Sequence, residues 1–181
     1  MSRLTIYPDS APDAPRLVTD EPAAIAANLA TVGVRFERWS GPVRLPPDAE
    51  QDAILAAYRP YLDDLMGASG AGSADVVRMR PDMDNLPAIR AKFLAEHTHS
   101  EDEIRFFVRG SGNFILHLNN EVWDAHCTQG DLISVPANTR HWFDAGTAPE
   151  FTCLRVFTDA SGWVPHYTGD PIAERFPADP G

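Results

Sequence analysis

Between about residues 103 and 157 the chain consists of short apolar runs separated by turn residues, and this feature limits the possible folds more than any other. Each run has the length and residue types of a β-strand. Gly110-Ser111-Gly112 predicts a turn, and Asn119-Asn120 predicts a two-residue hairpin. Short strands in close succession are typical of a β-sandwich or a barrel. The expected strands are 103–108, 113–118, one that begins at 121–123, 132–135, about 140–143, and 151–157.

The first 95 residues or so have another pattern, which predicts mainly helices. Asp20-Glu21-Pro22 has the features of a helix start, and Gly33 lies where that helix would end. A second helix begins near Asp48, and Pro60 within it predicts a kink or a break. The other expected elements are a short strand at 34–39 and a helix from about 87 to 96. We therefore expect a mainly β domain with α-helices packed outside, mostly from the N-terminal half.

Length and composition favour one domain and exclude several kinds of partner. The 181 residues are expected to form a helical part (about 1–95), a metal-binding β core (about 96–160) and a C-terminal tail (161–181). A net charge of −11 argues against nucleic acid and anionic membranes, because those partners need a basic patch. No segment resembles a signal peptide or a membrane span, so we expect a cytoplasmic protein, and we expect a monomer. Cys127 and Cys153 are interpreted as reduced packing residues.

Two histidines and a glutamate in Glu96-His97-Thr98-His99-Ser100-Glu101-Asp102-Glu103 are candidate metal ligands. In an extended chain His97 and His99 project to the same side, and Glu103 shares their parity. Two imidazoles and a carboxylate suit a borderline divalent ion such as Fe, Ni, Mn, Co or Zn. His141, on a later strand, is placed to be a fourth ligand. Alternatively, H-x-H is a surface or packing feature, Glu103 is a solvated acid and His141 is a core residue; the joint placement of the four favours the metal site.

This joint pattern resembles the cupin superfamily, whose motifs read G-x5-H-x-H-x3,4-E-x6-G and G-x5-P-x-G-x2-H-x3-N. The matching residues are His97, His99, Glu103 and Gly110 in the first motif, and Gly130, Pro136 and His141 in the second. Three positions depart from the motifs: Ala91 and Asn138 replace glycines, and Ala145 replaces the last asparagine. The resemblance implies a double-stranded β-helix, or jelly-roll barrel, built around a metal.

A narrower resemblance is to the bacterial acireductone dioxygenase family, in matching order from about residue 4 to residue 177. It rests on the segments 33–39, 92–99, 103–108, 131–137, 141–144, 162–163 and 168–170. The resemblance implies that the chain binds one Fe(2+) or Ni(2+) and uses O2 to oxidise the acireductone 1,2-dihydroxy-3-keto-5-methylthiopentene in methionine salvage. With iron the products would be formate and 4-methylthio-2-oxobutanoate. With nickel they would be formate, CO and 3-methylthiopropanoate.

Five further residues are candidates for substrate contacts. Arg105 shares the parity of Glu103 and should face the metal chamber; we hypothesise that it stabilises a bound enediolate, as the resemblance also implies. Arg155 would face the same chamber if its strand points Phe151 and Phe157 inward. Phe93, Phe143 and Trp163 are candidates for an apolar wall around the methylthio tail. The alternatives are an exposed arginine and ordinary core aromatic residues.

For three other histidines, for Asp102 and for the activity, the sequence allows more than one interpretation. Asp102 is either a residue that orients a ligand histidine or an exposed acid, and His117 is interpreted as structural. His126 and His166 look peripheral. For the activity, the alternatives are a cupin that binds a small molecule without redox chemistry and a metal-dependent isomerase. The run Glu103-Ile104-Arg105-Phe106-Phe107 followed later by Trp163 favours the dioxygenase.

Overall fold

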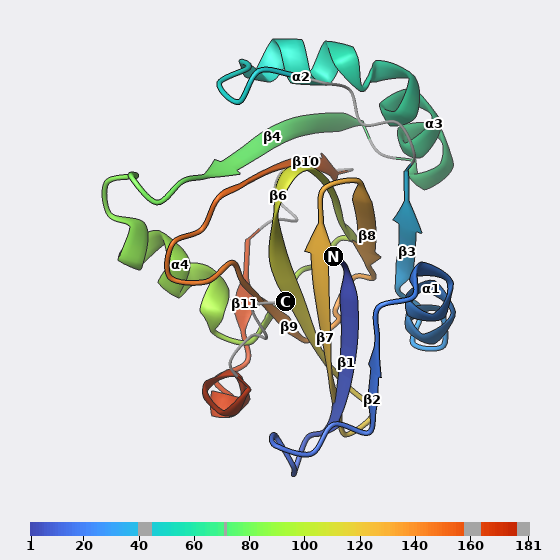
Figure 1. The fold of residues 1–181 in the computed structure, drawn as a ribbon, viewed down its shortest axis with the longest axis vertical. Coiled ribbons are helices and arrows are strands. Elements are labelled where there is room, and N and C mark those ends of the chain that lie inside the picture. The colour runs from blue at the N-terminus through green and yellow to red at the C-terminus, as the bar shows by residue number, and fades with distance from the viewer. Residues whose placement is uncertain (40–44, 71, 158–163, 177–181) are drawn as a thin grey trace.

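The structure is a computed structural model that describes residues 1–39, 45–70, 72–157 and 164–176. Strands dominate it and helices lie outside them, as expected (Figure 1). The strands are β1 (Arg3–Pro8), β2 (Leu17–Thr19), β3 (Arg35–Arg38), β4 (Ser73–Met79), β5 (His97–Thr98), β6 (Glu103–Leu118), β7 (Glu121–Thr128), β8 (Asp131–Val135), β9 (His141–Asp144), β10 (Phe151–Phe157) and β11 (His166–Tyr167). The helices are α1 (Pro22–Ala30), α2 (Gln51–Ala57), α3 (Arg59–Ser69), α4 (Leu86–Leu94) and the 3-10 helix η2 (Pro171–Arg175).

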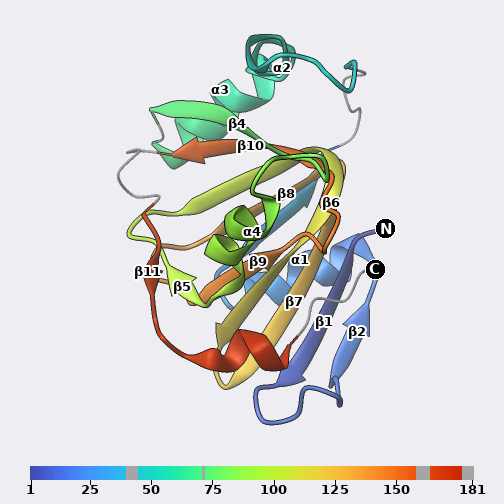
Figure 2. The same ribbon diagram turned by 90° about the vertical axis from the view of Figure 1, so that its left-hand side faces the viewer.

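The long strand β6 joins the two halves of an antiparallel barrel (Figure 2). Its first half pairs with β8 and β10, and these strands extend outward to β3 and β4. Its second half pairs with β7 and β9, which extend to β1, β2, β5 and β11. In consequence the two halves of β6 contribute side chains to the same interior. Within the described ranges, no helix combines the length and apolar character that crossing a bilayer requires.

The expected turn at Gly110-Ser111-Gly112 is wrong, because β6 runs without a break from Glu103 to Leu118. Gly110 instead adopts left-handed backbone within the strand, with a φ of +73°, and the register with β10 shifts at Val108, between the Phe107 and Arg109 pairs. A Cβ on Gly110 would lie 1.9 Å from the carbonyl oxygen of Glu150. Glycine is therefore needed at position 110 for its left-handed backbone and for the close approach of the Glu150 carbonyl, not for a chain reversal. The second expected turn is confirmed, since Asn119 and Asn120 both have positive φ in the β6–β7 hairpin.

Three strands in the N-terminal part, β1, β2 and β4, were not expected from the sequence. In β1 three successive residues are buried, and in β4 most residues are half-buried, so neither shows the alternation of a half-buried strand. Their partners are distant in sequence: β1 pairs with β7, and β4 pairs with β10. Tertiary pairing rather than local pattern therefore makes these segments strands. The break at Pro60 is confirmed, because α2 ends and α3 begins around Tyr58.

Two apolar layers explain why β6 is buried on both faces. Phe107, Phe114 and Leu116 point into the barrel and belong to its inner core. Phe106 and Val108 point outward and pack in a second cluster with residues of α2 and α3, which lie across β4 and β10 (Figure 1). Because helices cover the outer face, that part of the strand is apolar on both sides.

Candidate metal centre

Three histidines converge at one mouth of the barrel. His97 in β5 is paired directly with His141 in β9, and His99 follows β5 by one residue. The ligand nitrogens of these three histidines all lie within 4.8 Å of one another. Glu103, the first residue of β6, completes the group, because its Oε2 lies 2.8 Å from Nε2 of His141 and 3.9 Å from Nε2 of His99. The structure thus brings together all four residues that the sequence predicts as ligands, and all four are buried.

Backbone carbonyls orient two of the imidazole rings. Nδ1 of His97 lies 2.7 Å from the carbonyl oxygen of Ala95, and Nδ1 of His141 lies 2.8 Å from that of Thr139. Since a carbonyl oxygen only accepts hydrogen bonds, each Nδ1 carries the proton. The lone pair of each neutral ring is therefore on Nε2, which leaves this atom able to bind a metal.

Backbone contacts also hold the two ligand-bearing loops together. The amide of Asn138 donates to the carbonyl of His99 at 2.7 Å, and Asn138 has a φ of +60° at the position where the cupin motif has glycine. The exposed Asp102 accepts a hydrogen bond from the amide of Ala137 at 2.9 Å. Asp102 is thus seen to hold the loop before His141 and not to contact a ligand imidazole directly.

The electrostatics of the site favour the metal-binding protonation state in three of the four residues. Burial lowers the pKa of His97 to about 4, and it also lowers the pKa of His99. Burial alone would raise the pKa of Glu103, but the charges of Arg105 and His141 hold that pKa well below its ordinary value. Burial would lower the pKa of His141 too, yet the carboxylate of Glu103 outweighs it and raises this pKa. At neutral pH the site therefore offers two neutral imidazoles, His97 and His99, and an ionised carboxylate, whereas His141 has to release its proton when a metal binds.

The contact between Glu103 and His141 shows that the site fits a cation. Oε2 of Glu103 and Nε2 of His141 are both buried, and neither makes a hydrogen bond of acceptable geometry with the described residues. Two lone pairs that face each other at 2.8 Å repel, unless a proton or a cation lies between them. A divalent metal that also accepts the lone pairs of His97 and His99 satisfies both atoms.

Both candidate arginines lie on the inner side of the barrel, but in different surroundings. Arg105 is buried and donates from Nε and Nη2 to Oε1 of Glu103, at 3.0 and 2.7 Å. Arg155 lies directly opposite Arg105 in the register of β10 and β6. Its guanidinium makes a two-pronged ion pair with Asp75 of β4. Asp75 could not be predicted as a partner of Arg155, because β4 was not expected.

Of the three candidate aromatic residues, two can be placed. The rings of Phe93 and Phe143 are 6.5 Å apart and meet edge to face beside the inner core. Phe143 also contacts the rings of Phe114 and Phe151, at centroid distances of 5.0 and 5.4 Å. Both rings are thus part of the packing at this end of the barrel, and contact with a substrate stays a prediction. Trp163 lies outside the described residues.

A buried hydrogen-bonded pair, Glu96 and His117, lies directly next to His97 and was not predicted from the sequence. Glu96 is only 1% exposed, and its Oε2 lies 2.7 Å from Nδ1 of His117. The hydroxyl of Thr168, near the C-terminus, donates to the other carboxylate oxygen of Glu96 at 2.6 Å. In an extended chain Glu96 and His97 project to opposite faces, and this alternation was the one sequence signal that Glu96 has a role separate from metal binding. The interpretation of His117 as structural stays a prediction, and its contact with buried Glu96 agrees with it.

Comparison with known proteins shows which family this chain belongs to. A sequence model described as the ARD/ARD' family matches residues 3–165. The chain belongs to the ARD/ARD' family. It is 68% identical to acireductone dioxygenase of Granulibacter bethesdensis over 98% of this chain and 99% of that protein. It is 62% identical to acireductone dioxygenase of Acidiphilium cryptum, over 98% of each chain.

A solved structure of the ARD/ARD' family confirms the cupin fold. Acireductone dioxygenase from Bacillus anthracis, which holds a cadmium ion in its active centre, superposes with a TM-score of 0.82. That match covers 92% of this chain and 98% of the other, at 29% identity. The protein is therefore an enzyme of the acireductone dioxygenase family with a site for a single metal ion.

Proposed function

We propose that this protein uses one Fe(2+) or Ni(2+), held by His97, His99, Glu103 and His141, to cleave the acireductone 1,2-dihydroxy-3-keto-5-methylthiopentene with O2. The observation that carries the proposal is the convergence of three buried imidazoles on a buried, ionised carboxylate. Three nitrogen ligands and one oxygen ligand suit both ions. A metal held by these four residues would act as a Lewis acid towards the substrate. The names of the relatives support the choice of substrate.

Arg105 contributes positive charge at the position where an acidic enediol needs it. Its guanidinium keeps Glu103 ionised and lies in a buried site, where a charge acts more strongly than in water. We propose that Arg105 also stabilises the deprotonated enediol. Arg155 lies opposite Arg105 on the same face, where its ion pair with Asp75 orients the guanidinium. A chain of net charge −11 thus creates a local site for an anionic substrate.

The aromatic residues are proposed to hold the other end of the substrate. Phe93 of α4 and Phe143 of β9 lie against each other and border a small pocket that is also lined by Met79 and Leu94 and, at its polar side, by the ion pair of Arg90 and Asp144. Their apolar surface suits a methylthio tail and excludes water from the reacting end. This arrangement supports a substrate with one acidic and one apolar end.

The first experiment measures metal content in purified variants. We expect close to one Fe or Ni per wild-type chain and a loss of most of it in His141→Ala, because one of four ligands is removed. His166→Ala is the matched control, since His166 is exposed and belongs to no ligand group among the described residues. Equal metal content in the His141→Ala variant and the control would show that the metal is held elsewhere.

The second experiment tests the reaction and the products. Metal-free protein is reconstituted separately with Fe(2+) and Ni(2+), and acireductone and O2 consumption are followed together. We propose formate and 4-methylthio-2-oxobutanoate with iron, as in methionine salvage, and formate, CO and 3-methylthiopropanoate with nickel. Substrate loss without O2 consumption would instead indicate an isomerase, and binding without turnover would indicate a binding module. Either result overturns the proposed activity.

A further inference from the structure

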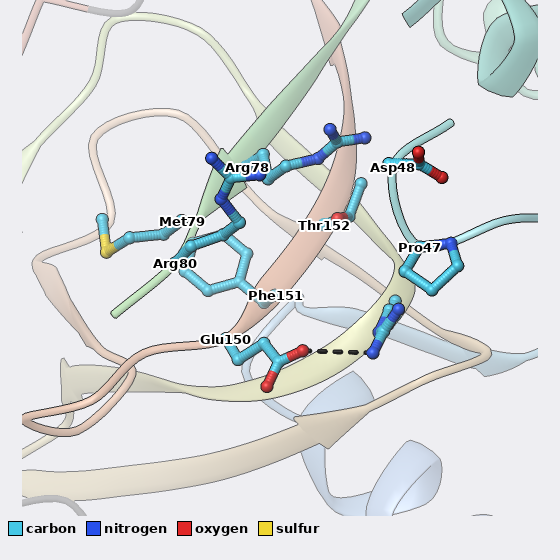
Figure 3. A pocket seen from close by; sticks show the side chains of 9 residues that line it. Pro47, Asp48, Arg78, Met79, Arg80, Glu150, Phe151 and Thr152 are labelled. Atoms are coloured by element: carbon cyan, nitrogen blue, oxygen red, sulfur yellow. Dashed lines mark hydrogen bonds and ion pairs between the residues drawn. The ribbon is translucent and has the colours of Figure 1, made fainter. Parts of the chain in front are cut away.

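A small arginine-lined groove lies on the outer face of β4, β10 and β6 (Figure 3). Its volume is about 150 Å³, and it is bordered by Arg78, Arg80, Arg109 and Thr152, together with the loop at Pro47 and Asp48. Pockets for drug-sized ligands have roughly 300–1,000 Å³. The groove is therefore of a size for a small ion or for one end of a larger molecule, and it belongs to no part of the metal centre.

The arginines come together because of a specific register. Arg78 of β4 and Arg109 of β6 are both paired with Thr152 of β10, which lies between them. Residues directly opposite one another in an antiparallel sheet project to the same face. Two guanidinium groups on flanking strands thus stand on either side of the hydroxyl of Thr152.

The bulge in β6 is what brings Arg109 to this face. Regular alternation from Arg105 and Phe107, which both point inward, would direct Arg109 into the barrel. The register with β10 shifts between Thr152 and Cys153, and Arg109 becomes the partner of Thr152 on the outer face. Bulges commonly redirect side chains in this way. The extra residue at Val108 thus contributes to the groove as well as to the barrel.

Arg78 is held in place but retains an unused hydrogen-bond donor. Its Nη2 donates to the carbonyl of Ala49, in the loop before α2. Its Nε is buried and has no hydrogen-bond partner among the described residues. Buried donors are nearly always satisfied, so an exception at a cation indicates a missing acceptor.

The charges around the groove favour an anion that replaces weak surface pairs. Arg109 is paired with Glu150 at 3.1 Å, but the two side chains are 44% and 62% exposed. Arg80 is paired with Asp82, and this pair is also exposed. Exposed ion pairs contribute little and are readily exchanged. A ligand with several anionic oxygens gains contacts with all three guanidinium groups, whose planar forks match phosphate oxygens.

We propose that Arg78, Arg80 and Arg109 form a binding site for a phosphate group, which is carried either by inorganic phosphate or by a small phosphomonoester. Lined by three arginines and two acids, the groove has a local charge opposite to that of the whole chain. The site is independent of the metal centre and of the proposed reaction.

The test is calorimetric titration of the metal-loaded protein with inorganic phosphate and, separately, with glycerol phosphate at constant ionic strength, which removes general screening effects. We expect saturable binding of at least one of the two, and the comparison identifies the source of the phosphate group. Arg78→Gln/Arg109→Gln should weaken binding by on the order of tenfold or more, since two charge-assisted contacts are lost. Arg16→Gln/Arg35→Gln removes the same charge from exposed, paired arginines elsewhere and should leave binding within about twofold.

Three results would overturn the proposal: no saturable binding of either compound, equal binding by the groove variant and the wild type, or equal loss in the control variant. The second result would place the phosphate at another position, such as the metal centre. The single variant Arg109→Gln provides a second test in case the double variant does not fold. Its side chain is exposed, so the fold should be unaffected while binding falls several-fold.

Discussion

Arg105→Met is the substitution that most directly tests the electrostatics of the metal centre. Methionine keeps an unbranched apolar side chain but removes both hydrogen bonds to Oε1 of Glu103. Glu103 is only 4% exposed, so water cannot replace the lost donors. In the metal-free protein, the substitution leaves a buried carboxylate without the cation that holds its pKa down.

The expected loss is about 3–5 kcal/mol in the free energy of unfolding of the metal-free protein, which is the usual cost of removing one partner from a buried ion pair. In the metal-loaded protein the loss should be smaller, because a divalent cation compensates the same carboxylate. The loss also depends on pH. A carboxyl whose pKa is depressed in the folded state contributes stability above its unfolded pKa of about 4.3. The difference between wild type and variant should therefore be full above about pH 5 and should shrink as the pH falls further.

Urea unfolding followed by tryptophan fluorescence measures these differences, with and without metal and at several pH values. Arg35→Met is the matched control, because Arg35 is an exposed β-strand arginine that is also paired with a glutamate two residues away, Glu37. Its expected cost is below about 1 kcal/mol. If Arg105→Met costs the metal-free protein no more than Arg35→Met does, then Arg105 does not stabilise the ionised carboxylate and our account of the site is wrong.

Three other predictions concern the stability of the fold and the burial of the two thiols. Gly110→Ala should lower the free energy of unfolding by at least about 3 kcal/mol, because the cost of left-handed backbone adds to that of a clash with the carbonyl of Glu150. Thermal unfolding measures this loss. Gly67→Ala, in helix α3 with open space around it, should instead stabilise by about 0.5–1 kcal/mol in the same assay. Burial raises the pKa of the Cys153 thiol to about 12 and that of Cys127 well above its ordinary value. Both thiols should therefore resist a thiol reagent at pH 8 in the native protein and react in urea; rapid native reaction would contradict their burial.

The ligand set was readable from the sequence because it depends on local geometry. His97, His99 and Glu103 share one parity in an extended chain, and the pairing of His97 with His141 is what two strands of one barrel provide. The strands after residue 103 were predictable for the same reason, since turn residues such as Asn119-Asn120 separate them. Such short-range patterns can be read from the sequence because they do not depend on how the strands pack together.

Other features depended on contacts between distant segments. The continuity of β6 through Gly110, the strand character of β4 and the pairing of Glu96 with His117 all follow from which elements pack together. Arg109 is the clearest case: its parity directs it into the barrel, and a register shift against β10 puts it on the outer face.

The sequence by itself thus predicted four candidate metal ligands that the structure brings together, most of the β-strands of the core and the break in the second helical segment. Only the tertiary structure decided the long shared strand, the pairing of Arg155 with Asp75, and the arginine groove. The physical reason is that periodicity along a chain records which face a residue occupies. Register, bulges and ion pairs depend on a second segment, whose position is determined when the whole barrel packs.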